Sequence, residues 1–295
     1  MTEFSIILED ACFLEGSRWV DGRLWVSDCY TQRVISVAED GSDPRVEAMI
    51  RGQPSGLGFL PDGRLLAVSM RDQHIKRRES DGSIVTHADL RGIANSQIND
   101  MAVDPQGRCW VGCFGFDIAA GEPMKPAVLV RVDPDGSAEV VAEDVWFPNG
   151  AVCDGRTLIV AETFMNRVTA FDVDADGSLL DRRDWARFGD QPGALKLDEV
   201  IPLLDMAADG MSEPDAEGAI WVADAFHGRA LRVREGGEVL QEIDLPEGQI
   251  YDVTLGGADG RTLFLATSLN GPVEAERDDT RLATLFSTRV DVALG

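Results

Sequence analysis

Oxygen-bearing side chains recur along this chain six to nine residues before a repeated turn glycine. The residues at this position are Glu15, Gly56, Asn99, Asn149, Asp209 and Asp252. If a repeating fold brings these positions together, their carboxylates and amides form a repulsive cluster unless a cation lies among them. The spacing therefore predicts a metal site. The alternative is that these polar residues only hydrogen-bond the backbone of the turn loops.

The repeat consists of a strand, a tight turn and a second strand. Its turn glycines are separated by 41, 44, 48, 63 and 42 residues, and they are Gly22, Gly63, Gly107, Gly155, Gly218 and Gly260. An Asp-Gly pair between two aliphatic runs, as at Asp154-Gly155, predicts a β-hairpin. A period of about 40 to 50 residues with several short strands per unit is typical of propeller blades. Because six such units bury one another's sheets when they stack radially, the chain is predicted to be an all-β, six-bladed β-propeller.

The whole chain, residues 1–295, is predicted to form a single propeller domain, because no linker or shift in composition divides it. Outer strands such as 33–37 and 167–171 follow the inner hairpins, and no run of useful length has helical periodicity. Residues 4–9 indicate a lone strand ahead of the first repeat. We expect this strand to pair with strands in residues 283–294, since closing the ring hides sheet edges that would otherwise aggregate.

Two insertions interrupt the repeat, at residues 113–126 and 185–206. Loops longer than their siblings often form lids or pocket walls. The side chains that would line an apolar mouth are Phe114, Phe116, Met124, Trp146 and Phe147. In the alternative interpretation the first insertion folds onto the propeller's own surface, so its role as a lid stays open.

Composition excludes several classes of function. The formal net charge is −25, from 27 basic and 52 acidic residues, which disfavours nucleic acid as a partner because phosphate binding needs a basic surface. No apolar run is long enough to span a membrane. The N-terminus lacks the basic flank and cleavage site of a secretory signal, so a cytoplasmic location is expected. Five cysteines, an odd number, argue against a disulfide framework.

Histidine-dependent catalysis has little support in the sequence. His74 and His87 fall in or near outer strands, and His227 alone follows an inner-strand repeat, where it would approach the mouth. Asp224 and Tyr251 are further polar groups near inner strands. No glycine-rich phosphate loop follows a strand and opens a helix.

Several motifs resemble those of the senescence marker protein/gluconolactonase/regucalcin family. They are Leu14-Glu15-Gly16, Asn99-Asp100-Met101, Pro148-Asn149-Gly150, Ala208-Asp209-Gly210-Met211 and the closing Gly256-Gly257. The resemblance covers nearly the whole chain and keeps the motifs in order. It implies a six-bladed propeller with one divalent cation at the mouth of its central channel and, for many members, hydrolysis of lactones.

Carried over to this sequence, the resemblance makes Glu15, Asn149 and Asp209 the metal ligands and Asp209 also the general base. Asn99 would lie beside the metal and touch either the ion or the substrate. Calcium is the expected ion, with Zn²⁺, Mn²⁺ and Mg²⁺ as alternatives, because carboxylate and amide oxygens are hard ligands. Gln97 stands where sugar-lactone members typically have Arg. It would contact substrate with one amide instead of a fixed fork of donors, which allows a less polar lactone or ester.

The expected function is that of a metal-dependent lactonase acting on a small-molecule lactone, either a sugar lactone or a less polar one. The cation would polarise the carbonyl, and a water deprotonated by Asp209 would attack it. One alternative is an organophosphate or aryl-ester hydrolase that uses the same metal site. Another is a non-catalytic, calcium-binding propeller that acts through its surfaces. The sequence does not indicate an oligomeric state.

Overall fold

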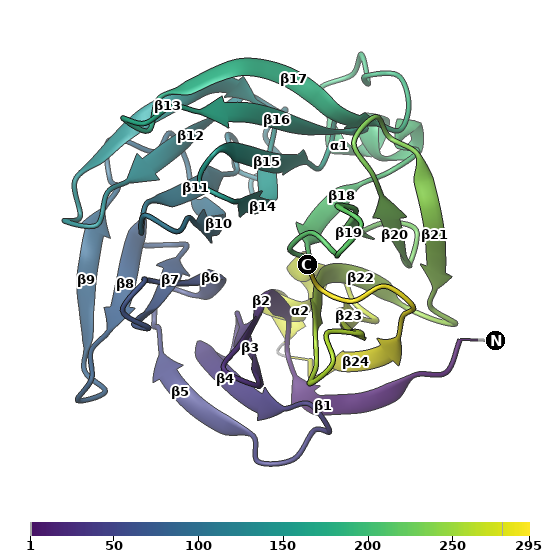
Figure 1. Ribbon diagram of the computed structural model, residues 1–295. Helices are drawn as coiled ribbons and strands as arrows, with labels where there is room; N and C mark the ends of the chain where they lie inside the picture. Colours follow the sequence, from purple (N-terminus) through teal and green to yellow (C-terminus); the bar gives the residue numbers. More distant parts are fainter. Residues whose placement is uncertain (1, 279) are drawn as a thin grey trace.

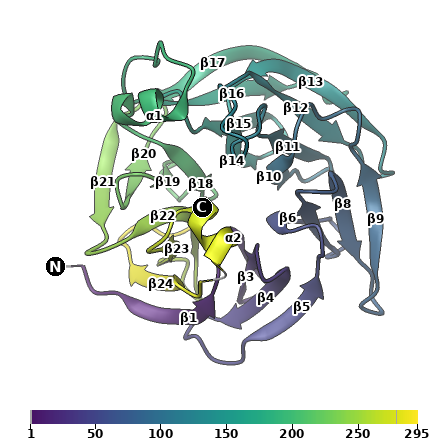
Figure 2. The same ribbon diagram turned by 180° about the vertical axis from the view of Figure 1, so that it is seen from behind.

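The structure is a computed structural model that describes residues 2–278 and 280–295. In this part of the chain, six four-stranded antiparallel sheets stand around a central axis (Figures 1 and 2). The predicted six-bladed β-propeller is therefore confirmed. None of the described helices is long and apolar enough to cross a bilayer.

Each blade runs outward from the axis in four strands. The innermost strands are β2 (Leu14–Val20), β6 (Pro54–Phe59), β10 (Ile98–Val103), β14 (Pro148–Cys153), β18 (Ala208–Met211) and β22 (Gln249–Gly256). The second strands are β3 (Arg23–Asp28), β7 (Leu65–Ser69), β11 (Cys109–Cys113), β15 (Thr157–Glu162), β19 (Ile220–Asp224) and β23 (Thr262–Ser268). The third strands are β4 (Arg33–Ala38), β8 (His74–Arg78), β12 (Ala127–Val132), β16 (Arg167–Val173), β20 (Arg229–Val233) and β24 (Ala283–Arg289). The outermost strands are β5 (Arg45–Met49), β9 (Ile84–Asp89), β13 (Ala138–Val145), β17 (Leu179–Arg187), β21 (Val239–Asp244) and β1 (Ser5–Ala11).

The repeated turn glycines all adopt a left-handed backbone. Their φ angles lie between 72° and 87°, a region that glycine enters without steric cost. The turn aspartates complete the geometry, because their carboxylates accept backbone N–H groups of the same turn. Asp154 Oδ1, for example, accepts from the nitrogens of Arg156 and Thr157, both at 2.8 Å. The turn glycines in the sequence therefore mark the position of the inner hairpin of each blade.

The ring closes through a blade that combines both ends of the chain. β1 pairs antiparallel with β24, from Ser5 opposite Ser287 to Ala11 opposite Ala283, and the sheet order is β1-β24-β23-β22. Figure 1 shows β1 lying along the outer side of β24. The predicted pairing of the lone first strand with the final segment is confirmed.

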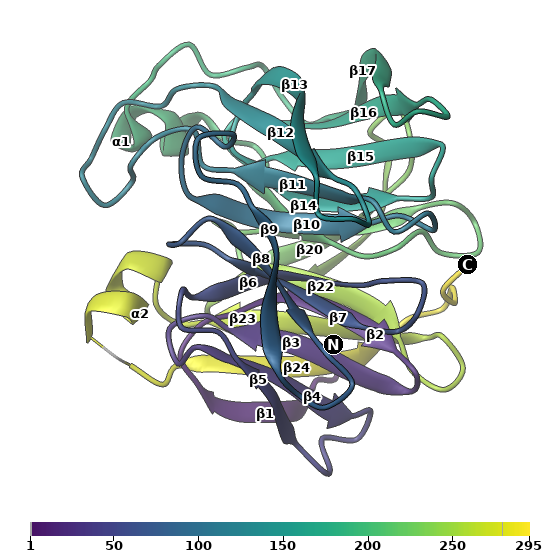
Figure 3. The same ribbon diagram turned by 90° about the vertical axis from the view of Figure 1, so that its left-hand side faces the viewer.

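The described residues include three short helices in the connections between strands, where the sequence pattern indicated none. α1 (Leu197–Val200) and the 3₁₀ helix η1 (Ile201–Leu203) follow β17, and α2 (Pro272–Asp278) joins β23 to β24. Figure 3 shows α1 and α2 projecting from the same face of the disc, with the C-terminus on the other face. β17 continues through Arg187, so the long connection into the fifth blade begins after that residue and not at 185.

Neighbouring blades approach closely at glycines of the inner strands. A Cβ on Gly150 would lie 2.4 Å from the carbonyl oxygen of Asp209, and one on Gly210 would lie 2.0 Å from Asp252 Oδ1. Such separations are shorter than any tolerated contact. Each innermost strand touches the innermost strands of both adjacent blades, so these glycines set how tightly the ring contracts around its axis.

This close approach predicts that Gly150→Ala destabilises the ring by about 1–3 kcal/mol, the usual cost of overpacking. The measurement is urea denaturation in the presence of a chelator, so that metal binding contributes nothing. Gly193→Ala is the matched control, because a Cβ at Gly193 meets no atom within 4 Å. Equal midpoints for the two variants would contradict the prediction.

Candidate functional site

A cavity of about 1080 Å³ opens on the face that carries α1 and α2. The residues that the sequence assigned to the site all line it: Glu15, Gln97, Asn99, Asn149 and Asp209. They come from the inner strands of four blades and from the segment before β10. The structure therefore brings together five residues that are spread over 195 positions of the chain, from 15 to 209.

A shared irregularity aims these side chains toward the axis. In every inner hairpin the pairing register shifts at the site, between Glu15 and Arg18 in the first blade and between Pro148 and Ala151 in the fourth. The same shift occurs in the other four blades. A shift of the β-bulge kind re-aims side chains and is common beside binding sites. Consecutive residues such as Asn99 and Asp100 are therefore both drawn into the centre of the ring.

The prediction was wrong by one residue in two blades. Neither Gly56 nor Asp252 lines the cavity, and their chain neighbours Ser55 and Tyr251 instead contact Glu15 and the cavity respectively. Tyr251 lines the cavity directly, and Ser55 donates its hydroxyl to Glu15 Oε2 at 2.8 Å. Counting back from a turn glycine misplaces these positions because the distance from the glycine to the side chain at the axis differs between blades, from six residues at Asn149 to nine at Tyr251.

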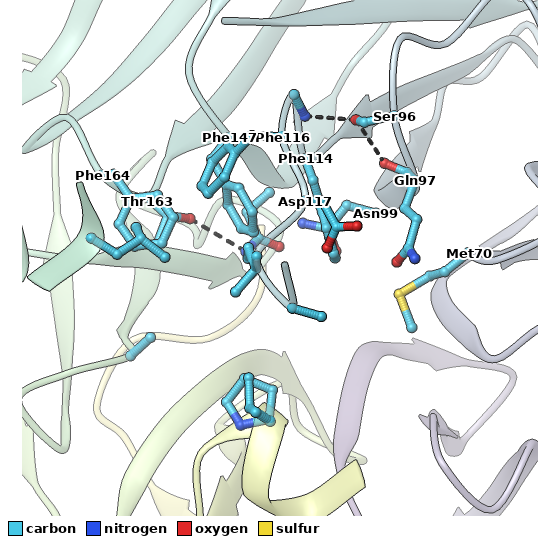
Figure 4. A pocket seen from close by; sticks show the side chains of 18 of the residues that line it. Met70, Ser96, Gln97, Asn99, Phe114, Phe116, Asp117, Phe147, Thr163 and Phe164 are labelled. Carbon is cyan, nitrogen blue, oxygen red and sulfur yellow. Dashed lines mark hydrogen bonds between the residues drawn. The ribbon is translucent and has the colours of Figure 1, made fainter. Parts of the chain in front are cut away.

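Hydrogen bonds fix the two amide side chains. Asn99 donates its Nδ2 to the carbonyl of Pro148 at 3.4 Å, and Asn149 donates its Nδ2 to the Thr163 hydroxyl at 3.3 Å. The second of these bonds is visible at Thr163 in Figure 4. Since each amide nitrogen has a protein acceptor, each side chain keeps its carbonyl oxygen as an available electron-pair donor.

The Asp209 carboxylate is the most informative group of the site. Its side chain is buried, and its Oδ1 has no hydrogen-bond partner. A buried carboxylate oxygen without a partner carries a large desolvation penalty. Burial raises the pKa of Asp209 well above its usual range, and the charges of Glu15, Asp252 and Asp100 raise it further. The environment therefore disfavours the ionised form unless a positive charge is supplied.

Three further carboxyl groups share this environment. Burial raises the pKa of Glu15 to about 8, against the Ser55 hydrogen bond and with help from Asp100 and Asp252. Burial also raises the pKa of Asp252 to about 6 and that of Asp100. These effects show that the four carboxyl groups lie close enough to repel one another.

One guanidinium lies below the cavity and offsets part of this charge. Arg18 donates to the carbonyls of Ser17 and Met101, both at 2.7 Å, and lies 3.4 Å from Asp100 Oδ1. It lowers the pKa of Asp100 and of Asp252 against the effect of burial. Four carboxylates against this one guanidinium leave three negative charges when all are ionised. The surplus matches a site for a divalent cation.

The donor set also fits a hard divalent ion. Glu15, Asn149 and Asp209 offer two carboxylates and an amide oxygen, and Asn99 offers a second amide oxygen; such oxygens suit Ca²⁺. The described residues contain no group of three or more His, Cys, Asp or Glu side chains placed to hold a metal. A set of two carboxylates and two amides does not require such a group.

Aromatic side chains form a wall of the cavity. Three of them belong to a pattern that repeats in the sequence. An acidic residue ends the second strand of three blades, and an aromatic residue follows two positions later: Asp28 and Tyr30, Glu162 and Phe164, Asp224 and Phe226. All three aromatic residues line the cavity. The sequence analysis missed Phe164 and Phe226, although this repeat could have revealed them.

The acid in each of these turns is fully buried and forms an ion pair with an arginine five residues later. The nitrogen–oxygen distances are 2.7 Å for Asp28–Arg33, 2.8 Å for Glu162–Arg167 and 2.9 Å for Asp224–Arg229. Each carboxylate also accepts a backbone N–H of the segment that leads into a neighbouring inner strand, from Cys12, Trp146 and Ala207 respectively. The ion pairs thus tie each aromatic turn to the start of an inner strand.

His227 belongs to this framework and not to the cavity. Its Nδ1 lies 2.8 Å from Asp224 Oδ1, and it is absent from the cavity lining, so its predicted approach to the mouth is wrong. The predicted aromatic mouth is largely confirmed by Phe114, Phe116 and Phe147, which line the cavity. Met124 is instead buried in the hydrophobic core, and Trp146 packs against that core.

Comparison with known proteins shows where this architecture recurs. Residues 13–269 match the family model described as the SMP-30/Gluconolactonase/LRE-like region. The chain is 32% identical over 209 residues to 6-deoxy-6-sulfogluconolactonase of Pseudomonas putida, an alignment that covers 68% of this chain and 64% of that protein. It is 32% identical over 197 residues to regucalcin of Danio rerio, covering 64% of this chain and 60% of that protein. The alignments thus span less than two thirds of either relative.

A solved structure shares the fold over the full chain. It is a calcium-binding protein, regucalcin, from Agrobacterium tumefaciens str. C58, which superposes with a TM-score of 0.76 at 20% identity and covers 100% of this chain and 96% of its own. At this identity the likeness concerns the fold alone. The family match spans 257 consecutive residues, from 13 to 269, and includes all five cavity residues assigned from the sequence. The chain belongs to the SMP-30/gluconolactonase/LRE-like family.

Proposed function

We propose that this protein is a metal-dependent lactonase, which hydrolyses a cyclic ester to the open hydroxy acid. The observation that carries the proposal is the unpartnered, buried Oδ1 of Asp209 at the edge of a substrate-sized cavity. A stabilising role alone gives no reason for such an atom to persist. The relatives named for gluconolactone chemistry support the same class of reaction.

Glu15, Asn149 and Asp209 would hold the ion, with Asn99 beside it. When bound, a divalent cation here would withdraw electrons from an ester carbonyl and stabilise the negative charge that develops on its oxygen. Calcium is the ion we propose, because the donors are all oxygens and because a relative with the same fold binds calcium. Zn²⁺, Mn²⁺ and Mg²⁺ are the alternatives that a metal add-back experiment distinguishes.

Asp209 would act as the general base. Its carboxylate accepts a proton from a water molecule as the water oxygen bonds to the carbonyl carbon. The ring C–O bond then breaks, and the departing alkoxide takes up a proton, so that one water is consumed for each ester opened. General-base assistance of this kind contributes about 10²–10⁴-fold to the rate. Gln97 and Asn99 supply amide groups that orient the substrate from the side of the third blade.

The same cavity supports a second enzymatic candidate, an aryl-ester or organophosphate hydrolase. A phosphoryl oxygen can replace an ester carbonyl, and the aromatic wall would accept an aryl leaving group. A purely calcium-binding scaffold is less well supported, since that function gives no reason for an open cavity of about 1080 Å³ next to the acidic cluster.

The experiment that tests the proposal is turnover of a lactone panel before and after chelation. We expect chelated protein to lose at least about 99% of its activity, because the charge-stabilising cation is worth several kcal/mol in the transition state. Each metal is then added back separately, and the ion that restores the highest rate is identified. Full activity in the chelated protein would contradict metal dependence.

Asp209→Asn is expected to lower kcat by about 10²–10⁴-fold, because an amide cannot accept the proton from water. The variant keeps the size of the side chain and removes one of four clustered charges, so the chelated protein should fold and be at least as stable as the wild type. Asp198→Asn, on the exposed surface of α1, is the matched control and should retain wild-type kcat. An active Asp209→Asn enzyme would exclude Asp209 as the base.

The carboxyl cluster also predicts how stability changes with pH. The pKa of Glu15 is raised from 4.5 to about 8, so between these values the folded state binds more protons than the unfolded state, and stability falls as pH rises. We expect the melting temperature of chelated protein to drop by about 5–10 °C from pH 5 to pH 8. Bound Ca²⁺ should remove most of this drop, since it competes with the protons. An ion effect equally large at both pH values would contradict the prediction.

A further inference from the structure

We infer that the substrate carries an apolar ring, preferably an aromatic one, next to its ester, and that it carries no anionic group. The inference rests on the lactonase function proposed above and specifies the substrate class of the same cavity. The ring opening is unchanged: the water oxygen bonds to the carbonyl carbon, the ring C–O bond breaks, and the product is a hydroxy acid with an apolar substituent.

A continuous wall of phenylalanine rings forms one side of the cavity. The centroid distances along it are 4.9 Å for Phe114–Phe147, 4.9 Å for Phe147–Phe164 and 6.3 Å for Phe164–Phe226. The rings come from four different connections, those after β11, before β14, after β15 and after β19. Figure 4 shows the labelled phenylalanines gathered on one side of the cavity. Aromatic rings at these separations stack favourably with a further ring.

The wall is held in place before any substrate binds. Phe147 adopts a left-handed φ of 51°, a conformation that costs a non-glycine residue energy and persists only where the surroundings require it. Phe164 and Phe226 stand on the turns that the buried Glu162–Arg167 and Asp224–Arg229 ion pairs fix. A rigid apolar wall loses little conformational entropy when it binds a ligand.

The opposite side of the cavity is also largely apolar. Met70 lies there in Figure 4, across from Phe164, with the Gln97 amide beside it. Tyr30 and Tyr251 continue this side, and both pack against Phe13, with centroid distances of 5.6 and 4.6 Å. An aromatic substituent would therefore find apolar atoms on either side of the cavity to pack against, whereas a ring covered with hydroxyl groups would leave those hydroxyls without partners there.

The charged residues of the cavity exclude an anionic substrate. Among the described lining residues the two basic side chains are Arg71 and Lys125, and each is engaged by a carboxylate. Arg71 forms an ion pair with Glu276, and Lys125 Nζ lies 2.9 Å from Glu122. Asp117 and Glu274 add further negative charge to the lining. A carboxylate or sulfonate on the substrate would meet repulsion from these acids, and both basic side chains of the lining are already paired.

The test compares three six-membered lactones with the metal-loaded enzyme. They are δ-valerolactone with a phenyl group on the carbon next to the ring oxygen, the same lactone with a carboxylate there, and glucono-1,5-lactone. Each rate is divided by the uncatalysed rate, so that intrinsic reactivity cancels. We expect kcat/KM for the phenyl compound to exceed both others by at least about tenfold, in line with the discrimination of apolar pockets.

Phe226→Ala tests the wall itself. The ring is 38% exposed, so its removal does not threaten folding. We expect the ratio of kcat/KM for the phenyl compound to that for glucono-1,5-lactone to fall about tenfold. Leu180→Ala, at an apolar position on β17 that is 49% exposed and lies outside the cavity, is the control and should keep the wild-type ratio.

The outcomes separate this inference from the proposed function. Preference for glucono-1,5-lactone or for the carboxylated compound, or an unchanged ratio in Phe226→Ala, would overturn the substrate class and leave the lactonase function standing. Absence of turnover with all three compounds and every added metal would overturn the lactonase function. In that case, calorimetric binding of the phenyl and carboxylated compounds to Asp209→Asn still decides the preference, and tighter binding of the carboxylated one would refute it.

Discussion

The repulsion among four buried carboxyl groups at the axis is the constraint on which the rest of this structure depends. Glu15, Asp100, Asp209 and Asp252 each gain a raised pKa from burial. No single blade creates this arrangement, because each contributes one inner strand and the ring draws those strands together. The tight inner ring and the left-handed turns position the acids, and Arg18 with a bound cation would make their proximity tolerable. The folded arrangement of these acids therefore favours the binding of a positive charge.

The periodic features of the fold could be predicted from the sequence, and the local ones could not. Turn glycines such as Gly155 recur because every blade needs the same backbone conformation, so blade number and ring closure follow from spacing. The positions of Ser55 and Tyr251 do not follow from spacing. They depend on how many residues separate the turn glycine from the axis, a number that differs between blades and has no residue signature of its own. The repeat spacing and the family resemblance both pointed to Glu15, Asn149 and Asp209, which line the cavity.

The wall of phenylalanine rings in the cavity illustrates a different limit of prediction. Phe114 and Phe147 were anticipated because the first lies in the insertion at residues 113–126 and the second directly precedes the Pro148-Asn149-Gly150 motif. Phe164 and Phe226 come from ordinary tight turns, and their partners are distant in the sequence. The recurrent acid followed by an aromatic residue is visible along the chain, yet its meaning depends on knowing that the acid is paired with an arginine below the surface. α2 escaped prediction because a helix of seven residues leaves too little periodicity to detect.

The pairing of β1 with β24 sets the order in which the molecule can be assembled in time. During synthesis β1 emerges from the ribosome long before its partner β24, with the other strands of the ring between them. Until β24 has been made, the sixth sheet cannot include β1, because β24 lies between β1 and β23. The ring of blades therefore stays open. The axial acids remain hydrated in the nascent chain, because the strand that carries Asp252 joins them only late. An incomplete chain therefore lacks Asp252 at the axis and leaves the edge of a sheet exposed.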